Sequence, residues 1–391
     1  MSPTCLLVLR HCFSFYCLGI GLSTSLVRCG SSWSGGRTER EAAAATSARP
    51  THRARAAVQG LEPTGVPNRR PLIDWTTGAT GWWEMASSTG VVAFSGRPIR
   101  SADVVVRREL LRGLGRLNAT STVLQRARLA DPLGGMWEAA DVQWWWRRPR
   151  ATDELALSVW FDEVGPVAAA GLTAWDDTWQ ADVFVLPSIV KEEDVWAATL
   201  EATAGHRGEA LRLLVHEDDA LLTDLAIRSG FAMTDELSGT AWMDADHHPP
   251  VAQVDGFAIV DRVVRADRPH PMIARNGELV ERRLRQCSLY DPTLDLAVED
   301  ADGRVAGYAL FWFDHTTLVG LLEPMRVEDE YQRRGLARML LTNGLDRLAR
   351  KGARRLKVGF GTDVARSLYL SAGFVQTSID RLLIRPARRE Q

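Results

Sequence analysis

One stretch near the C-terminal end of the chain combines residue types that suit a phosphate-binding site. Residues 332–337, Q-R-R-G-L-A, follow an apolar strand-like segment and begin a segment with helical spacing. A strand that leads into a helix presents unpaired backbone N–H groups and the positive end of the helix dipole, which together favour an anion. Gly335 and Ala337 have little or no side chain, so a diphosphate can approach the backbone there. From the glycine alone, an ordinary amphipathic helix with a glycine in its first turn is the alternative.

A carboxylate on the strand before this turn is the candidate general base. Glu323 is in phase, by the period of two of a strand, with Leu321, Met325 and Val327, so we expect it on their otherwise apolar face. Partial desolvation there raises a carboxylate pKa toward neutral pH. A hydrogen-bonded strand carboxylate is the alternative. Pro324 removes a ladder donor and is typical of a bulge or an unpaired edge.

The elements that must position these residues form one α/β unit in the second half of the chain. Strands are expected at residues 294–298, 305–313, 319–327 and 355–360, with a hairpin at Asp302-Gly303. Leucines at helical spacing predict a helix over 336–348. A short helix over 363–372, capped by Gly373, and a last strand from Phe374 complete the unit.

The first half repeats this order at an offset of 143 residues. Leu213 and Val215 fall on Leu356 and Val358, and Gly230-Phe231 falls on Gly373-Phe374. Strands over 155–160, 166–175 and 181–186 and a helix over 193–203 are the expected counterparts. The two halves therefore read as copies of one fold. The run Trp144-Trp145-Trp146 is expected in core or interdomain packing.

The motif at residues 332–337 resembles the pyrophosphate-binding motif (Q/R)-x-x-G-x-(G/A) of the GNAT acyltransferase superfamily. Residues 365–374, A-R-S-L-Y-L-S-A-G-F, are similar to the downstream helix motif of that superfamily. The tandem arrangement resembles that of mycothiol synthase-like proteins. The likeness implies two tandem GNAT-like α/β (α+β) domains, each a mixed, mostly antiparallel sheet flanked by helices. It also implies that the fourth and fifth strands splay apart in the C-terminal copy.

The resemblance also implies a cofactor and a set of site residues. Acetyl-CoA is the expected co-substrate, with Tyr369 protonating the departing thiolate and Glu323 as the base. A core aromatic is the alternative for Tyr369. The expected cofactor-binding residues are Met325, Arg326, Val327, Gln332, Arg333, Arg334, Gly335, Leu336, Ala337 and Arg338. One departure is Thr362, followed by Asp363, where many relatives carry Asn; either residue can instead cap the helix.

The first half lacks a matching phosphate site. At the corresponding position it carries Lys191-Glu192-Glu193-Asp194, whose carboxylates would repel a diphosphate. We therefore expect residues 102–246 to be a degenerate GNAT-like domain that serves as scaffold or as a wall of the acceptor pocket. Residues 247–253 are expected to be a linker and 254–391 the catalytic GNAT domain. His247 and His248 are expected to be solvated, and no metal is expected.

Composition limits the partners. Forty-seven basic and 49 acidic residues leave a net charge of -2, which gives no support to nucleic-acid or membrane binding by the whole chain. Only three basic residues, Lys191, Lys351 and Lys357, are lysines, so arginine-rich segments such as 347–355 reflect composition. Residues 1–70 are expected to be a low-complexity, disordered leader, and 71–101 an irregular lead-in. The oligomeric state is left open.

These observations predict a cytoplasmic N-acetyltransferase whose acceptor is a primary amine of a small molecule or a protein. A non-catalytic acyl-CoA-binding sensor or interaction module is the alternative. A Gly335→Glu variant separates the phosphate-site hypothesis from an ordinary helix.

Overall fold

The computed structural model describes residues 105–206 and 208–387. The predicted leader (1–70) and lead-in (71–101) lie outside the described residues. No helix in the described part of the chain is both long and apolar enough to cross a membrane.

The first half has the predicted order of helices and strands. Its elements are β1 (Arg107–Leu111), α1 (Gly113–Ala130), α2 (Ala139–Trp145), β2 (Leu157–Phe161), β3 (Pro166–Ala174), β4 (Thr178–Val185), α3 (Glu192–Glu201), β5 (Ala210–His216), α4 (Ala220–Arg228) and β6 (Ala232–Asp244). The short 3₁₀ helix η1 (Ala245–His247) follows β6.

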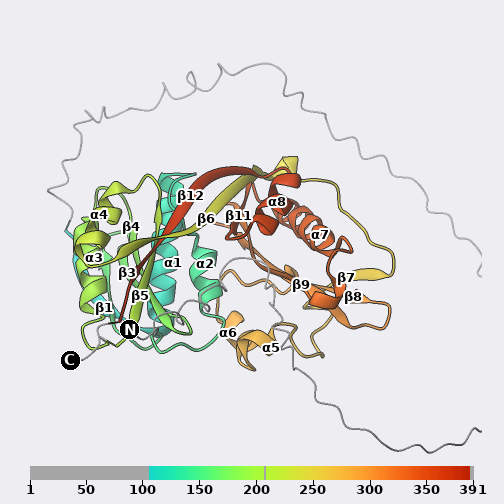
Figure 1. Cartoon of the computed structure of the whole chain (residues 1–391), viewed down its shortest axis with the longest axis horizontal. Coiled ribbons are helices and arrows are strands. Elements are labelled where there is room, and N and C mark those ends of the chain that lie inside the picture. Colours follow the sequence, from blue (N-terminus) through green and yellow to red (C-terminus); the bar gives the residue numbers. More distant parts are fainter. Residues whose placement is uncertain (1–104, 207, 388–391) are drawn as a thin grey trace, which may run out of the picture. The chain divides into compact units, whose positions relative to one another are not determined.

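The second half repeats that order (Figure 1). Its elements are β7 (Phe257–Asp261), α5 (Ile273–Asn276), α6 (Val280–Leu284), β8 (Asp295–Asp300), β9 (Val305–Asp314), β10 (Val319–Val327), η2 (Asp329–Tyr331), α7 (Leu336–Lys351), β11 (Arg355–Phe360), α8 (Asp363–Ser371) and β12 (Val375–Arg385). The offset of 143 carries α4 onto α8 from first residue to last and the start of β6 onto the start of β12. The predicted repeat is confirmed.

The two halves share one twelve-stranded sheet, in the order β1-β2-β3-β4-β5-β12-β6-β11-β10-β9-β8-β7. Only β4–β5 and β10–β11 are parallel among the strand pairs of the described residues, so the mixed, mostly antiparallel sheet is confirmed. The last strands are exchanged: β12 pairs with β5 of the first half, β6 pairs with β11 of the second, and β6 and β12 pair with each other. Figure 1 shows these two long strands bridging the halves. Each half thus completes the sheet of the other, a feature that the sequence did not predict. The boundaries at 102–246, 247–253 and 254–391 stay predictions.

The strands β10 and β11 separate part-way along their length. Val319 to Leu322 pair with Arg355 to Val358, but β10 continues to Val327 and β11 to Phe360 without pairing each other. The pairing of β10 with β9 also shifts register between Leu322 and Met325, around Pro324. The predicted splay and the irregularity at Pro324 are both confirmed.

Tryptophans of the first half pack against the second. Trp144, Trp145 and Trp146 are buried in one hydrophobic cluster with residues of the second half, among them Met272 and Trp312. Trp146 Nε1 donates to Gln286 Oε1 at 2.8 Å. The predicted packing role of this run is confirmed.

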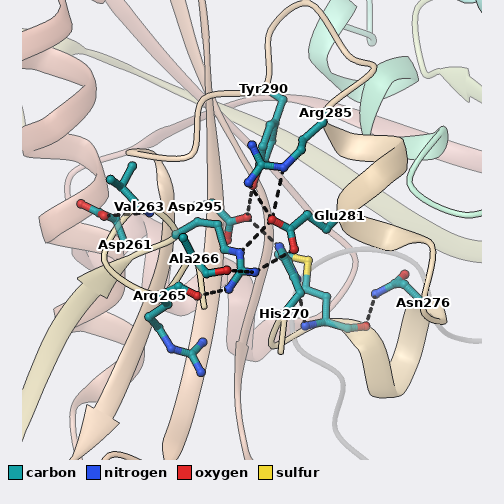
Figure 2. Close-up of polar contacts among 12 residues, drawn as sticks. Asp261, Val263, Arg265, Ala266, His270, Asn276, Glu281, Arg285, Tyr290 and Asp295 are labelled. Atoms are coloured by element: carbon teal, nitrogen blue, oxygen red, sulfur yellow. Dashed lines mark hydrogen bonds and ion pairs between the residues drawn. The ribbon is translucent and has the colours of Figure 1, made fainter. Parts of the chain in front are cut away.

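A polar network fixes the segment that carries α5 and α6 (Figure 2). The buried His270 Nε2 lies 2.8 Å from Asp295 Oδ2, which also accepts a hydrogen bond from the Tyr290 hydroxyl at 2.8 Å. Arg262 forms a two-pronged ion pair with Glu281 of α6, at 3.1 and 2.7 Å. These bonds attach the α5–α6 segment to β7 and to the start of β8, and so set the position of Asn276 beside the first half.

A buried ionic cluster joins the halves. Glu138 accepts hydrogen bonds from Arg128 Nε at 3.1 Å and from Lys357 Nζ at 2.9 Å, and all three side chains are buried. Burial alone would raise the pKa of Glu138, but the charges of Lys357 and Arg128 outweigh it and hold that pKa below its usual value. The indole of Trp242 lies 5.0 Å from the Arg128 guanidinium carbon and 5.3 Å from Lys357 Nζ.

Replacement of Glu138 by Gln should destabilise the protein by about 3–5 kcal/mol, because it leaves two buried cations without their counter-ion. Urea unfolding of the full chain measures the loss. Glu163→Gln, at an exposed carboxylate, is the matched control and should change stability by less than about 0.5 kcal/mol. Equal unfolding midpoints for the two variants would show that the cluster contributes nothing.

Candidate active site

The turn from β10 into α7 has the geometry of an anion site. Gly335 is the N-terminal cap of α7 with φ of 84°, and Arg333 also has a positive φ of 61°. No side chain caps this end of the helix, so the first amides of α7 are left to other partners. Arg333, Arg334, Gly335 and Arg338 are exposed. The predicted phosphate site is therefore an accessible helix N-terminus flanked by arginines.

Glycine is required at position 335 by conformation rather than by crowding. A Cβ atom built there would lie 3.5 Å from Val254 Cγ2, an ordinary contact, but the positive φ is strained for any other residue. The remaining predicted residues of the turn have structural partners. Gln332 Nε2 donates to Val327 O at 3.3 Å and to Asp329 Oδ1 at 3.0 Å, while Leu336 is buried and Ala337 is half-buried.

The backbone of residues 325–327 lies at the open side of β10. Met325 and Val327 pair with Ala309 and Gly307 of β9, and β11 does not pair with this part of β10. The Arg326 side chain is engaged by Glu328 and Asp329, at 3.3 and 3.0 Å. The backbone of residues 325–327 therefore has no strand partner on the β11 side. The Arg326 guanidinium is held by its acidic neighbours instead.

The prediction that Glu323 shares a face with Met325 and Val327 is wrong. Leu321 packs in the cluster that contains Trp312 and the α2 tryptophans, whereas Leu322, Met325 and Val327 pack in the cluster beneath α7. The register shift after Leu322 changes the alternation, as expected of a bulge. Glu323 lines a cavity with Leu321 on the α2 side, and its carbonyl oxygen accepts a hydrogen bond from Trp312 Nε1 at 2.8 Å.

Glu323 forms a buried carboxyl pair with Asp141 of α2. Burial, the charge of Asp141 and a hydrogen bond with it all raise the pKa of Glu323 well above its usual value. Burial likewise raises the pKa of Asp141, against the opposing charge of Lys357. Two carboxyls in contact cannot both ionise at low cost, so the titrations of Glu323 and Asp141 are linked. The expected desolvated carboxylate is present, with a partner from the other half.

An arginine of the first half stands beside this pair. Arg147 Nε donates to Asn276 Oδ1 at 2.7 Å, and its guanidinium carbon lies 4.0 Å from the centroid of Trp144. Burial lowers the pKa of Arg147 to about 9, although the charge of Glu323 opposes that shift. It remains cationic at neutral pH and favours the ionised form of the carboxyl pair.

Tyr369 is fully buried on α8. Its ring packs edge-on against Phe374 at 6.0 Å and belongs to the same core as Met325, Val327 and Leu336. The cavity that Glu323 lines includes neither Tyr369 nor Val327. The structure therefore places Tyr369 in the same hydrophobic cluster as Met325 and Val327 but not in the cavity of Glu323. Thr362 caps α8 through a hydrogen bond from Ala365 N at 3.2 Å, one of the two alternatives that the sequence left open.

The first half has carboxylates at the start of the corresponding helix. Glu192, Glu193 and Asp194 form the first turn of α3. Burial, Asp219 and Glu193 together raise the pKa of Glu192 to about 7. Negative charge already crowds this helix N-terminus, which supports the interpretation that the first copy does not bind a diphosphate.

Residues of types that can bind a metal ion lie close together at one place in the described part of the chain. Asp244, Asp246 and His247 bring one ligand atom each within 4.8 Å of one another, at the end of β6. All three are exposed, and exposed acidic groups are common without an ion, so we assign no metal to them.

The sequence missed three residues that line or flank the carboxyl site: Asp141, Arg147 and Asp380. All reach it through contacts between the halves or through the exchanged strand β12. Each lies outside the GNAT-like motifs. The sequence repeat does not indicate that β6 and β12 are exchanged between the halves.

Comparisons with known proteins bear on the family and the fold. Residues 261–374 match the model of the acetyltransferase (GNAT) family. A tandem GNAT protein from the clavulanic acid biosynthesis pathway is 17% identical with a TM-score of 0.53, and the alignment covers 73% of this chain and 100% of that one. The GCN5-related N-acetyltransferase from Sphaerobacter thermophilus is 14% identical with a TM-score of 0.48, over 73% and 97% of the two chains. No curated protein matches the sequence.

The second half of the chain is thus a GNAT-family domain. The two halves together have the tandem GNAT fold, as the sequence predicted. The resemblance to mycothiol synthase-like proteins stays a prediction.

The raised pKa of Glu323 predicts how stability depends on pH. A carboxyl with a raised pKa binds more protons folded than unfolded, so its contribution is present below the unfolded pKa and is lost as pH rises through the folded one. As the pH rises from 5 to 8.5, Glu323→Gln should therefore gain stability relative to the parent. Urea unfolding at both pH values tests this. Parallel pH profiles, as expected for the exposed control Glu163→Gln, would contradict the assignment.

Proposed function

We propose that the second half is an N-acetyltransferase that moves an acetyl group from acetyl-CoA to a primary amine of a small molecule or a protein. The observation that carries the proposal is the uncapped N-terminus of α7, with Arg333 and Gly335 at positive φ, beside the separation of β10 from β11. The GNAT family match supports acyl transfer in general. The cytoplasmic location stays a prediction.

The chain offers matching groups for each part of the cofactor. The amides that open α7 and the exposed Arg333, Arg334 and Arg338 suit a diphosphate, since helix N-terminal N–H groups and guanidinium groups both favour phosphate oxygens. The unpaired backbone edge of residues 325–327 suits an extended amide-containing arm, which can add to a strand by backbone hydrogen bonds. When bound, acetyl-CoA supplies the activated acyl group.

The residues of the site then accept and donate the protons of the reaction. The ionised member of the Asp141–Glu323 pair accepts a proton from the acceptor ammonium, which frees the lone pair of the amine. The amine nitrogen forms a bond to the acetyl carbonyl carbon, and the bond from that carbon to sulfur breaks. Tyr369 is proposed to protonate the departing thiolate, and the second proton of the amine nitrogen then passes to the phenolate oxygen of Tyr369. The products are an N-acetyl amine and the free thiol of CoA.

Gly335→Glu should weaken acetyl-CoA binding by at least about 100-fold, because it adds a negative charge where the diphosphate is proposed to bind and strains a positive φ. Isothermal titration of the full chain with acetyl-CoA measures the change. Gly352→Glu is the matched control, since Gly352 also has a positive φ, of 99°, but ends α7. Similar affinities for both variants would refute the diphosphate assignment.

Glu323→Gln should lower kcat by roughly 100-fold while leaving acetyl-CoA affinity near that of the parent, because the amide cannot accept the proton of the amine. Tyr369→Phe should lower kcat by a similar order with little change in fold, since the ring stays in its core position. Thiol release in the presence of an amine panel is the measurement. Cofactor binding without any effect of either variant on turnover would favour a non-catalytic acyl-CoA-binding module.

A further inference from the structure

A small cavity lies where the two central strands separate. Glu323 and Gly359, the first residues of β10 and β11 beyond their last paired positions, both line it. The other lining residues are Met136, Trp137, Asp141, Ser238, Gly239, Thr240, Leu321, Lys357 and Asp380. They come from the loop and helix of the first half, from both exchanged strands and from the second half.

The cavity carries an acceptor that no protein group satisfies. Asp380 is 3% exposed, and its Oδ1 finds no hydrogen-bond donor among residues 105–206 and 208–387. Burial raises the pKa of Asp380 to about 6, against the opposing charges of His216 and Lys357, so it is mostly ionised at neutral pH. A buried, ionised oxygen without a donor is costly unless a ligand supplies one.

The lining offers negative acceptors in excess of free cations. Asp141, Glu323 and Asp380 face the cavity, and Lys357 is its one lining cation. The Lys357 ammonium is already held by Glu138 at 2.9 Å and by the carbonyl oxygen of Met136 at 2.5 Å. The lining therefore fits a group that carries several N–H donors and positive charge.

The size of the cavity restricts that group further. Its volume of about 20 Å³ holds roughly one water-sized group. An ammonium group at the end of a methylene chain suits this volume better than one on a branched carbon, which adds a methyl group beside the nitrogen. A carboxylate next to the amine would meet Asp141 and Asp380 as like charges.

We propose that this cavity receives the amino group of the acceptor, that Asp380 binds it, and that the acceptor is a primary amine on an unbranched alkyl chain without a neighbouring carboxylate. This inference rests on the proposed acetyl transfer and adds its acceptor class. It also gives the first half a role, since Trp137, Asp141 and β6 help to form the cavity. Asp380 holds the nitrogen at the point where the strands separate, while the Asp141–Glu323 pair takes its proton.

Thiol release from acetyl-CoA by the full chain tests the acceptor class. n-Butylamine, sec-butylamine and glycine differ in branching and in charge next to nitrogen. We expect kcat/KM for n-butylamine to exceed that for each of the other two by at least about tenfold. Equal kcat/KM values for n-butylamine and sec-butylamine, or for n-butylamine and glycine, would overturn the inference while leaving acetyl transfer intact.

Two variants test the cavity itself. Asp380→Asn should raise KM for n-butylamine at least about tenfold with KM for acetyl-CoA unchanged, and Ser238→Leu, at a half-buried lining position, should exclude the amine by filling the space. Asp244→Asn, at an exposed position on β6, is the control. Unchanged amine KM in both cavity variants would refute the assignment, and the Ser238 variant decides the matter if Asp380→Asn fails to fold.

If no amine releases thiol from the parent protein, the proposed transferase function fails and binding decides the inference separately. Titration of n-butylammonium chloride into the parent and into Asp380→Asn gives the readout. Binding by the parent that the variant weakens at least tenfold would support the cavity as an ammonium site. Absence of binding, or equal binding by both proteins, would overturn it.

Discussion

The separation of β10 from β11 after Leu322 and Val358 is the constraint on which the rest of the site depends. Up to Leu322 the edge of β10 is hydrogen-bonded to β11, whereas residues 325–327 have no partner in β11, so a ligand can add to that edge. Pro324 removes one donor from β10 just beyond the last pair with β11, and the pairing of β10 with β9 shifts register beside it. The same shift sends Glu323 to the α2 face and Met325 and Val327 to the α7 face. One local irregularity thus separates the chemical groups from the surface proposed for the cofactor.

The strand exchange explains how the first half participates although its own helix N-terminus is acidic. Because β6 lies between β11 and β12, its residues Ser238, Gly239 and Thr240 reach a cavity that also includes Glu323 of the second half. The tryptophans of α2 hold Asp141 against β10 from the other side of that cavity. Neither half alone assembles the carboxyl pair, so the site belongs to the twelve-stranded sheet as a whole.

The amino-acid sequence determines local features that can be recognised by period and turn chemistry, and these were predicted well. The bounds of β10 and β11, the glycine at the start of α7 and the repeat offset all follow from short-range patterns. The partners of Glu323 could not be predicted in this way, because Asp141 is distant in sequence and meets it only through packing between the halves. The predicted face of Glu323 was wrong for a related reason. A period of two assumes an unbroken strand, and Pro324 already indicated a break in this one.

Buried charge at this site is tolerable because it is distributed over groups that compensate one another. Glu138 stays ionised beside Arg128 and Lys357, with its pKa held low. Glu323 and Asp141, by contrast, have raised pKa values chiefly because they are buried, and the charge of Asp141 raises the pKa of Glu323 further. The charge of Lys357 lowers the pKa of Glu138 and of both members of the carboxyl pair. Its ammonium donates a hydrogen bond to Glu138, so its effect is greatest there. The division matters for chemistry, since a carboxylate whose pKa is lowered by a lysine is a weak base, whereas a carboxyl with a raised pKa is a stronger one. The structural salt bridge and the proposed base are thus adjacent groups with opposite pKa shifts, and the position of one lysine keeps them distinct.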